Sequence, residues 1–296
     1  PENGTPGLEE HWWAADYGRA RVFGLDSNGS YASQAQLDWL DEQLDATCTD
    51  ENIDIAIAQL HHPFLSELWV PGELDFTGEV IARMEAFTED CGRPSVHLFG
   101  HTHGYSRGQS QDHRHLWVNV ASAGGAIDRW GGSEQADYDE FTVSQDEWGF
   151  VAMEVDPDAL TLTRVSHGNT DTPRDNEIRD TIRVPFTPQA PSTPETNEAT
   201  VGDTVTLSAS AFEDDGQHGA SQWQVSADCD DFAAPLVDRW LQHENQFNGQ
   251  DTQAGDDLTD IELTELTTGS YCWRVRYRDR GLSWSDWSVP ASLMIP

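Results

Sequence analysis

The sequence predicts a layered α/β domain, an α/β sandwich, followed by an all-β sandwich. Apolar strands alternate with helical patterns before residue 185, whereas only short strands separated by Gly, Asp and Asn clusters follow residue 197. Between them, at 185–197, proline recurs every third residue, a spacing typical of polyproline II spacers. We therefore expect domains at 1–184 and 198–296, joined by a linker at 185–197.

Strands and helices are expected to alternate at the start of the first domain. Apolar runs predict strands and leucines on one face predict helices, so the expected order is strand 21–27, helix 32–47, strand 52–60, helix 77–90 and strand 95–100. Further apolar segments at 115–122, 148–155 and 160–166 indicate an antiparallel run. Alternating units followed by hairpins are typical of a layered α/β domain.

The second domain is expected to contain strands only. Short runs with polar breaks between them predict strands at 203–212, 220–227, 260–267, 270–279 and 291–296. No catalytic constellation occurs in this part of the sequence. Acidic loops at 212–219 and 228–232 offer oxygen ligands for calcium, although solvated loops are the simpler expectation.

The formal charge is strongly negative, because 16 basic and 53 acidic residues give −37, and all 16 basic residues are arginine. Such a charge repels nucleic acid and anionic membranes, so neither is an expected partner. No apolar stretch approaches the roughly 20 residues that cross a bilayer. Abundant Asp and absent Lys fit a protein kept soluble in salty or extracellular surroundings. We expect a secreted or cell-surface protein.

Four cysteines divide evenly between the two domains. Cys48 and Cys91 each follow a predicted helix, so a disulfide could join the ends of those helices. Cys229 follows one predicted strand and Cys272 begins another, which suits a bridge if the two strands are antiparallel. We expect one disulfide in each domain, and the alternative is four buried thiols.

Two strands of the first domain run directly into histidines. Strand 52–60 is followed by His61 and His62, and strand 95–100 by His101 and His103. Ligands gather beyond the carboxyl ends of strands in layered α/β sheets, so both groups would face one crevice. Residues two apart in an extended loop point the same way, so His101 and His103 could each reach one of two adjacent metals. An H-x-H pair alone is more often an exposed strand end.

The residues around the H-x-H pair form a longer pattern that is more specific than the pair alone. "GHTHGYSR" after an apolar strand, with "HHP" at the end of the preceding strand, resembles the calcineurin-like metallophosphoesterases, particularly their purple-acid-phosphatase-like branch, over roughly residues 14–170. The resemblance implies that His61 and His101 bind one metal ion and His103 the other. The ions would be divalent or trivalent Fe, Zn or Mn, and the substrate a phosphate ester.

The same resemblance assigns lesser roles to three residues. Tyr105 and Arg107 match the family's trailing Y-x-R, which either braces the histidine loop or borders the substrate pocket. His62 occupies the variable position between ligand and proline, so it is expected at the rim of the pocket.

The family's earlier motifs do not occur in the first domain. D-x-H, G-D-x-x and G-N-H-[DE] supply the carboxylate, asparagine and remaining histidine ligands, and none of them is present in residues 1–184. Either a companion N-terminal segment carries them, which we favour, or the protein has lost half of its catalytic residues. Three histidines could still hold one zinc ion. The expected function is hydrolysis of phosphoric esters at a dinuclear centre. The alternative is a structural or adhesive surface protein built on a degenerate phosphatase fold.

In the second domain, "YCWRVRYRDRGLSWSDWS" at 271–288 resembles the last strands of a fibronectin type III domain, including a W-S-x-W-S element. Strand alternation puts three arginines on one face, where two tryptophans could interleave with them. The expected role is a structural ladder, with ligand contact as the alternative. Its members are Arg274, Arg276, Arg278, Trp284 and Trp287.

Overall fold

The computed structural model describes residues 4–8, 10–214, 217–242, 245–252 and 257–296. The chain divides into two compact units, one comprising 1–187 with 246–250 and the other 188–245 with 251–296. The boundary between Thr187 and Pro188 falls inside the stretch of regularly spaced prolines. Each unit is described below by itself.

The first unit is built on one large sheet of order β1-β2-β3-β4-β6-β5-β7-β15-β16. Strands β2, β3, β4 and β6 are parallel to one another, whereas β1 and β5 pair antiparallel with their neighbours. The strands are β1 (Trp13–Tyr17), β2 (Ala20–Gly24), β3 (Ile55–Gln59), β4 (Ser95–Phe99), β5 (Tyr105–Gln109), β6 (His115–Asn119), β7 (Phe141–Gln145), β15 (Gln246–Phe247) and β16 (Gln250–Asp251).

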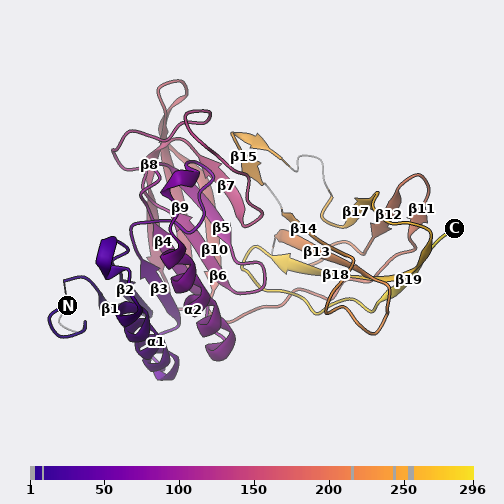
Figure 1. Ribbon diagram of the computed structural model, residues 1–296, viewed down its shortest axis with the longest axis horizontal. Helices are drawn as coiled ribbons and strands as arrows, with labels where there is room; N and C mark the ends of the chain where they lie inside the picture. Colours follow the sequence, from indigo (N-terminus) through magenta and orange to yellow (C-terminus); the bar gives the residue numbers. More distant parts are fainter. Residues whose placement is uncertain (1–3, 9, 215–216, 243–244, 253–256) are drawn as a thin grey trace. The chain divides into compact units, whose positions relative to one another are not determined.

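Two helices, α1 (Gln34–Thr49) and α2 (Asp75–Cys91), lie side by side against the parallel strands (Figure 1). Leu40 of α1 and Met84 of α2 are fully buried with Phe23 of β2 in one apolar cluster. Burying such side chains stabilises the layer by about 1.5–3 kcal/mol each. Two short 3-10 helices, η1 (Gly29–Tyr31) and η2 (Val70–Gly72), lie in the connecting loops.

A second, antiparallel sheet of order β10-β9-β8 completes the first unit. Its strands are β8 (Trp148–Val155), β9 (Ala159–Gly168) and β10 (Pro173–Pro185). Arg164 of β9 is buried and donates to the Ser122 hydroxyl and to the Glu147 carbonyl, which joins β9 to the loops that follow β6 and β7. With two sheets and only two described α-helices, the first unit is mostly sheet. The α/β alternation is confined to residues 20–99, because strands follow one another after β4.

The second unit contains two antiparallel sheets, β11-β12-β17 and β14-β13-β18-β19. Side chains from both sheets share one apolar cluster, in which Trp223 and Trp273 are fully buried and stack 5.8 Å apart beside Leu207. The strands are β11 (Thr200–Val201), β12 (Val205–Ser208), β13 (His218–Ser226), β14 (Val237–Gln242), β17 (Asp260–Leu263), β18 (Gly269–Asp279) and β19 (Ala291–Ile295).

Both acidic loops lie in the second unit. Asp215 and Gly216 of the loop at 212–219 lie outside the described residues. The loop at 228–232 is a turn closed by its own hydrogen bonds, in which Asp228 accepts from the backbone N–H of Asp230.

Both pairs of cysteines are bonded. Cys48 and Cys91 join the end of α1 to the end of α2, with Cα atoms 5.4 Å apart. Cys229 and Cys272 join the loop after β13 to β18, with Cα atoms 5.1 Å apart. No described helix is both long and apolar enough to cross a membrane.

Guanidinium groups and aromatic rings alternate along one face of β18. Arg274 lies 4.1 Å from the centre of the Trp287 ring, and Arg276 lies 4.1 Å from that of Trp284. Arg278 lies 5.3 Å from Trp284. The ladder extends beyond the residues expected from the sequence. Its two further members are Phe232, 4.3 Å from Arg274, and Trp240, 5.9 Å from Arg278.

Candidate metal centre

The parallel pairing of β3 and β4 brings two histidine loops to the same edge of the large sheet. Gln59, the last residue of β3, pairs with Leu98 of β4, so the chain leaves both strands at the same level. The N–H of Gly100 then donates to the carbonyl of His61 at 3.0 Å, which joins the two loops. The imidazoles that follow the two strands therefore meet.

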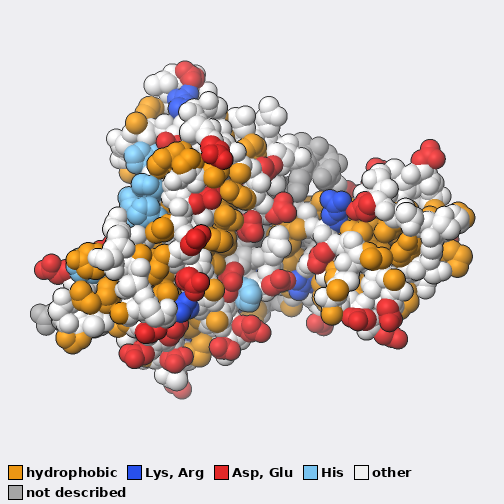
Figure 2. All heavy atoms as spheres, viewed as in Figure 1, with side chains coloured by type: hydrophobic (Ala, Val, Ile, Leu, Met, Phe, Trp, Pro, Cys, Tyr) orange, Lys and Arg blue, Asp and Glu red, His pale blue; other side chains and the backbone are white. Residues whose placement is uncertain are grey.

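Three of these imidazoles form a cluster. Nε2 of His61 lies 3.0 Å from Nδ1 of His101, and the ring centres of His62 and His101 are 4.4 Å apart. Potential ligand atoms of the three residues all lie within 4.8 Å of one another. Figure 2 shows histidine side chains gathered on one surface of the first unit.

The backbone at His101 is in the left-handed region, with φ 66°. This conformation costs a non-glycine residue about 1–2 kcal/mol, so the surrounding structure must impose it. The neighbouring Thr102 is fully buried, and its carbonyl and hydroxyl both accept from the side-chain amide of Asn119, at 2.8 and 2.9 Å. A Cβ at Gly104 would lie 2.2 Å from the Leu68 side chain and 3.0 Å from the Gln145 carbonyl oxygen, so a larger residue after the histidine pair would force Leu68 to move.

The hydroxyl of Ser27 determines which nitrogen of His62 carries the proton. Ser27 is buried, and its Oγ accepts from the backbone N–H groups of His61, at 3.2 Å, and His62, at 3.0 Å. Both lone pairs are then used, so its hydrogen donates to Nδ1 of His62 at 2.9 Å. Neutral His62 therefore carries its proton on Nε2, which is a hydrogen-bond donor and not a metal ligand.

His103 lies beside this cluster rather than within it. Its Nδ1 donates to the carbonyl of Ala126 at 2.7 Å, and its backbone N–H donates to Asp128 at 2.7 Å. A Cβ at Gly125 would lie 2.8 Å from the imidazole, so the ring rests directly on this glycine. Since Nδ1 is the donor, Nε2 keeps its lone pair, which is the tautomer that binds metal.

The environment favours neutral imidazoles. Burial lowers the pKa of His62, and the neighbouring His101 and His61 lower it further. Burial likewise lowers the pKa of His101, and His61 and His103 add to the effect. Neutral imidazole is the form that coordinates a metal ion.

Tyr105 and Arg107 are buried beneath the histidine loops. The Tyr105 hydroxyl donates to Asp180 at 2.7 Å, and Arg107 donates to the same carboxylate through two nitrogens, at 2.5 and 3.1 Å. Burial raises the pKa of Tyr105 well above its ordinary value, and the Asp180 charge adds to this. Tyr105 and Arg107 thus connect β5 to β10 and are 2% and 4% exposed.

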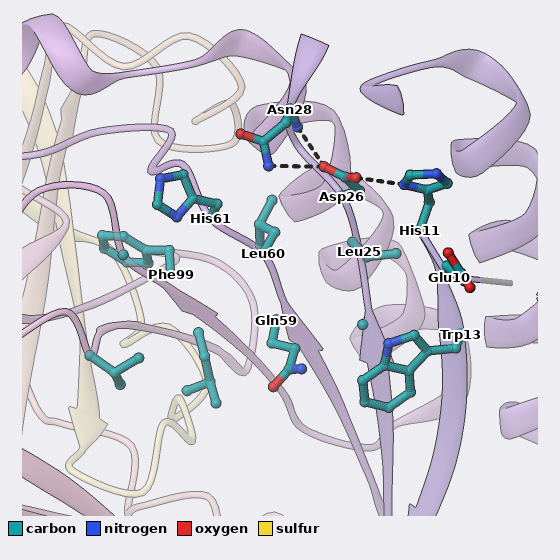
Figure 3. A pocket seen from close by; sticks show the side chains of 14 residues that line it. Glu10, His11, Trp13, Leu25, Asp26, Asn28, Gln59, Leu60, His61 and Phe99 are labelled. Carbon is teal, nitrogen blue, oxygen red and sulfur yellow. Dashed lines mark hydrogen bonds and ion pairs between the residues drawn. The ribbon is translucent and has the colours of Figure 1, made fainter. Parts of the chain in front are cut away.

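A pocket of about 480 Å³ opens beside His61 (Figure 3). Asp26 lies within it and accepts hydrogen bonds from the backbone N–H and side-chain amide of Asn28, both at 2.9 Å. Its other carboxylate oxygen lies 2.9 Å from Nδ1 of His11. These contacts lower the pKa of Asp26 against the opposing effect of burial. Neither Asp26 nor Ser27 was expected from the sequence, since neither follows a recognisable motif.

The donor set fits a transition-metal ion in part. Two nitrogens that each lie about 2.0–2.1 Å from one ion are about 2.9–3.4 Å apart at octahedral to tetrahedral angles. The 3.0 Å separation of His61 and His101 matches this range. The described cluster holds imidazoles without a carboxylate, so it lacks the bridging group that a dinuclear centre needs.

No protein-family model and no curated protein matches the chain. Solved structures similar to it include GAP50, the anchor in the inner membrane complex of Plasmodium, with TM-score 0.40 and 11% identity, covering 57% of this chain and 55% of that one. PhoD is similar with TM-score 0.45 and 13% identity, covering 60% of this chain and 42% of PhoD. Purple acid phosphatase PPD1 from yellow lupin (Lupinus luteus) seeds is similar with TM-score 0.45 and 15% identity, covering 61% of this chain and 34% of that one.

An Fn3-like protein from Clostridium thermocellum is similar to a smaller part of the chain, with TM-score 0.23 and 18% identity, covering 37% of this chain and 94% of that one. The chain thus spans between about a third and just over half of the length of the first three proteins. Likeness at these values establishes no family, and we base no assignment on it.

Proposed function

We propose that the first unit is the histidine-bearing part of a metal-dependent phosphoric ester hydrolase. The observation that carries this proposal is the meeting of His61 and His101 at 3.0 Å, at the ends of two parallel strands. The His101 backbone is held in an unfavourable conformation at this point, and such conformations cluster at functional sites.

His61 and His101 would hold one metal ion, and Nε2 of His103 is available to a second. Such ions bind phosphoryl oxygens and lower the pKa of a bound water. They would also reverse the local sign of a strongly acidic protein, which otherwise repels a phosphate ester.

Other residues of this chain take supporting roles. The N–H at Nε2 of His62, oriented by Ser27, donates a hydrogen bond to an oxygen of the bound ester. Tyr105 and Arg107 brace the loop from below through Asp180 rather than bordering the pocket.

The missing carboxylate ligands would come from a companion segment. The pocket beside His61 is open at the sheet edge and offers room for such a segment to approach the imidazoles. Disulfides in both units suit an oxidising compartment, so we place the protein outside the cell.

Calorimetric titration of the purified chain with Zn²⁺ tests whether His61 and His101 hold a metal ion. Replacing His61 or His101 with Ala should weaken binding by more than the roughly 10–100-fold that loss of a supporting residue costs. His113→Ala is the matched control, because His113 lies beside Glu85 and Glu89 and away from the cluster. Equal affinity in all three variants and the parent chain would contradict the proposal.

Mass spectrometry of natively purified material tests whether a companion segment supplies the missing ligands. A second polypeptide carrying the Asp and Asn-His motifs, together with metal-dependent hydrolysis of p-nitrophenyl phosphate, is the expected result. The competing function is a structural or adhesive surface protein, favoured by the absence of a carboxylate from the described cluster. A lone polypeptide without activity at any metal loading would support that function.

A further inference from the structure

We infer that a second pocket beside His103 binds an aromatic group, and that the substrate is a phosphate ester of an aromatic alcohol. This inference rests on the proposed function for the phosphoryl part of the substrate. The pocket has a volume of about 320 Å³ and is lined by Trp148, Phe150 and His167 with residues 122–124 and Gly149.

The walls of this pocket are aromatic. Phe150 is 46% exposed, although large apolar side chains are usually covered, and its ring lies 6.3 Å from that of His167. The hydroxyl of Ser122 is turned away from solvent, since it donates to the Gly149 carbonyl at 3.2 Å and accepts from Arg164 at 2.8 Å. The lining therefore offers ring faces, and it includes no carboxylate or guanidinium group.

The floor of the pocket depends on glycine. Gly149 has φ 153°, and a Cβ there would lie 2.0 Å from the carbonyl oxygen of Val165. Gly124 has φ 142°, and a Cβ there would meet no atom within 4 Å, because it would point into open space. Gly124 therefore leaves room for a flat group to lie against the backbone, whereas Gly149 allows Val165 to approach closely behind it.

One residue separates this pocket from the candidate metal centre. The carbonyl of Gly125 accepts from Nε1 of Trp148 at 2.9 Å, so the indole is held in place. The same glycine lies against the imidazole of His103 on its other side. A phosphoryl group at His103 would therefore place its ester oxygen next to the aromatic walls.

The charge of the protein favours the same occupant. At −37, the surface repels any further anionic group on the alcohol, such as a second phosphate or a carboxylate. A neutral aromatic ring is not repelled, and stacking on Trp148 and Phe150 stabilises it.

Calorimetry with the full chain and Zn²⁺ tests the inference, with phenyl phosphate and methyl phosphate as probes. We expect phenyl phosphate to bind about tenfold more tightly than methyl phosphate. Phe150→Ala should remove this preference without affecting methyl phosphate. Met153→Ala is the matched control, because Met153 is an exposed apolar residue of the same strand that does not line the pocket.

Binding of 1-naphthol without metal separates this inference from the proposed function. Naphthol binding that Phe150→Ala weakens, in natively purified material that binds no phosphate ester at any metal loading, supports the aromatic pocket and rejects the hydrolase. Metal-dependent binding of phenyl and methyl phosphate with equal affinity rejects the pocket and keeps the hydrolase. The inference is also overturned if naphthol binds the parent chain and the Phe150→Ala variant equally.

Discussion

At the scale of single residues, the candidate centre depends on a serine as much as on its histidines. Ser27 caps the backbone N–H groups of His61 and His62 and orients the His62 ring. Removing this hydroxyl takes a hydrogen bond from three partners; the one on the exposed His61 can bond to water instead, whereas a buried group left unsatisfied costs about 1–3 kcal/mol.

Ser27→Ala should therefore destabilise the loop and disturb the tautomer of His62. We expect a loss of about 1–3 kcal/mol in the free energy of unfolding, measured by urea denaturation. Histidine NMR at neutral pH should show the His62 proton redistributed between Nδ1 and Nε2. Ser33→Ala provides the control, since Ser33 precedes α1 without a side-chain capping bond. An unchanged His62 spectrum would contradict the assignment.

The sequence predicts the histidines of the centre but not their support. His61, His101 and His103 follow apolar strands in a recognisable spacing, whereas Ser27 is one of many serines and follows a strand without a motif. The left-handed backbone also falls on His101, although a glycine stands directly before it. Such conformations are imposed by packing around the loop, which local sequence does not reveal.

At the scale of elements, the apolar strands and both helices are predictable and the polar strands are not. β3 and β4 are nearly continuous apolar runs, as expected for buried parallel strands. β5 is equally buried but contains Tyr105 and Arg107, and no strand is expected there from the sequence. Its partner Asp180 lies on β10, far away in sequence, so the pairing that stabilises it is not visible locally.

A buried chain of hydrogen bonds joins β4, β6 and α2. Ser95 donates to the Met84 carbonyl at 3.1 Å and accepts from Nδ1 of His115 at 2.7 Å, and Nε2 of His115 accepts from Nδ1 of His97 at 2.9 Å. Both imidazoles are fully buried. Burial lowers the pKa of His97 to about 3 and that of His115 well below its ordinary value.

The buried histidines of this hydrogen-bonded chain make the stability of the first unit sensitive to acid. Between the ordinary pKa of 6.5 and the folded value of about 3, the unfolded chain binds a proton at His97 and the folded chain does not. The stability is therefore complete above pH 6.5 and falls as the pH decreases, by about 1.4 kcal/mol per pH unit for each such histidine.

Urea denaturation at pH 7 and pH 5 measures this dependence. His97→Asn should reduce the loss of stability on acidification relative to the parent chain. His113→Ala changes a half-buried histidine on the surface and should leave the loss unchanged. If His97→Asn loses as much stability as the parent chain, the buried pair does not control the acid response.

At the scale of the whole molecule, charge is the dominant property. Figure 2 shows acidic side chains scattered over the visible face with few arginines among them. The excess of −37 makes the folded chain repel itself. Ion pairs such as Arg107 with Asp180 are already counted in this net value, because all 16 arginines have been subtracted from the 53 acidic residues.

Salt should therefore stabilise the protein at neutral pH. Raising NaCl from about 0.01 to 1 M shortens the Debye length from about 30 to 3 Å, which screens the repulsion. We expect the Tm measured by circular dichroism to rise by several degrees. Near the sequence pI of 4.2 the repulsion is absent, and the same salt series should have little effect. A flat response at pH 7 would show that the charges are already compensated.

The left-handed backbone at His101 lowers the stability of the fold, while the His101 side chain supplies an imidazole to the candidate centre. Glycine would adopt the same φ without a steric cost, so a His101→Gly chain would fold more favourably at that position by up to about 1 kcal/mol. It would also lack the imidazole that meets His61. A laboratory selection that rewards thermal resistance alone would thus tend to erase this site, and retention of histidine there would indicate that something other than folding is under selection.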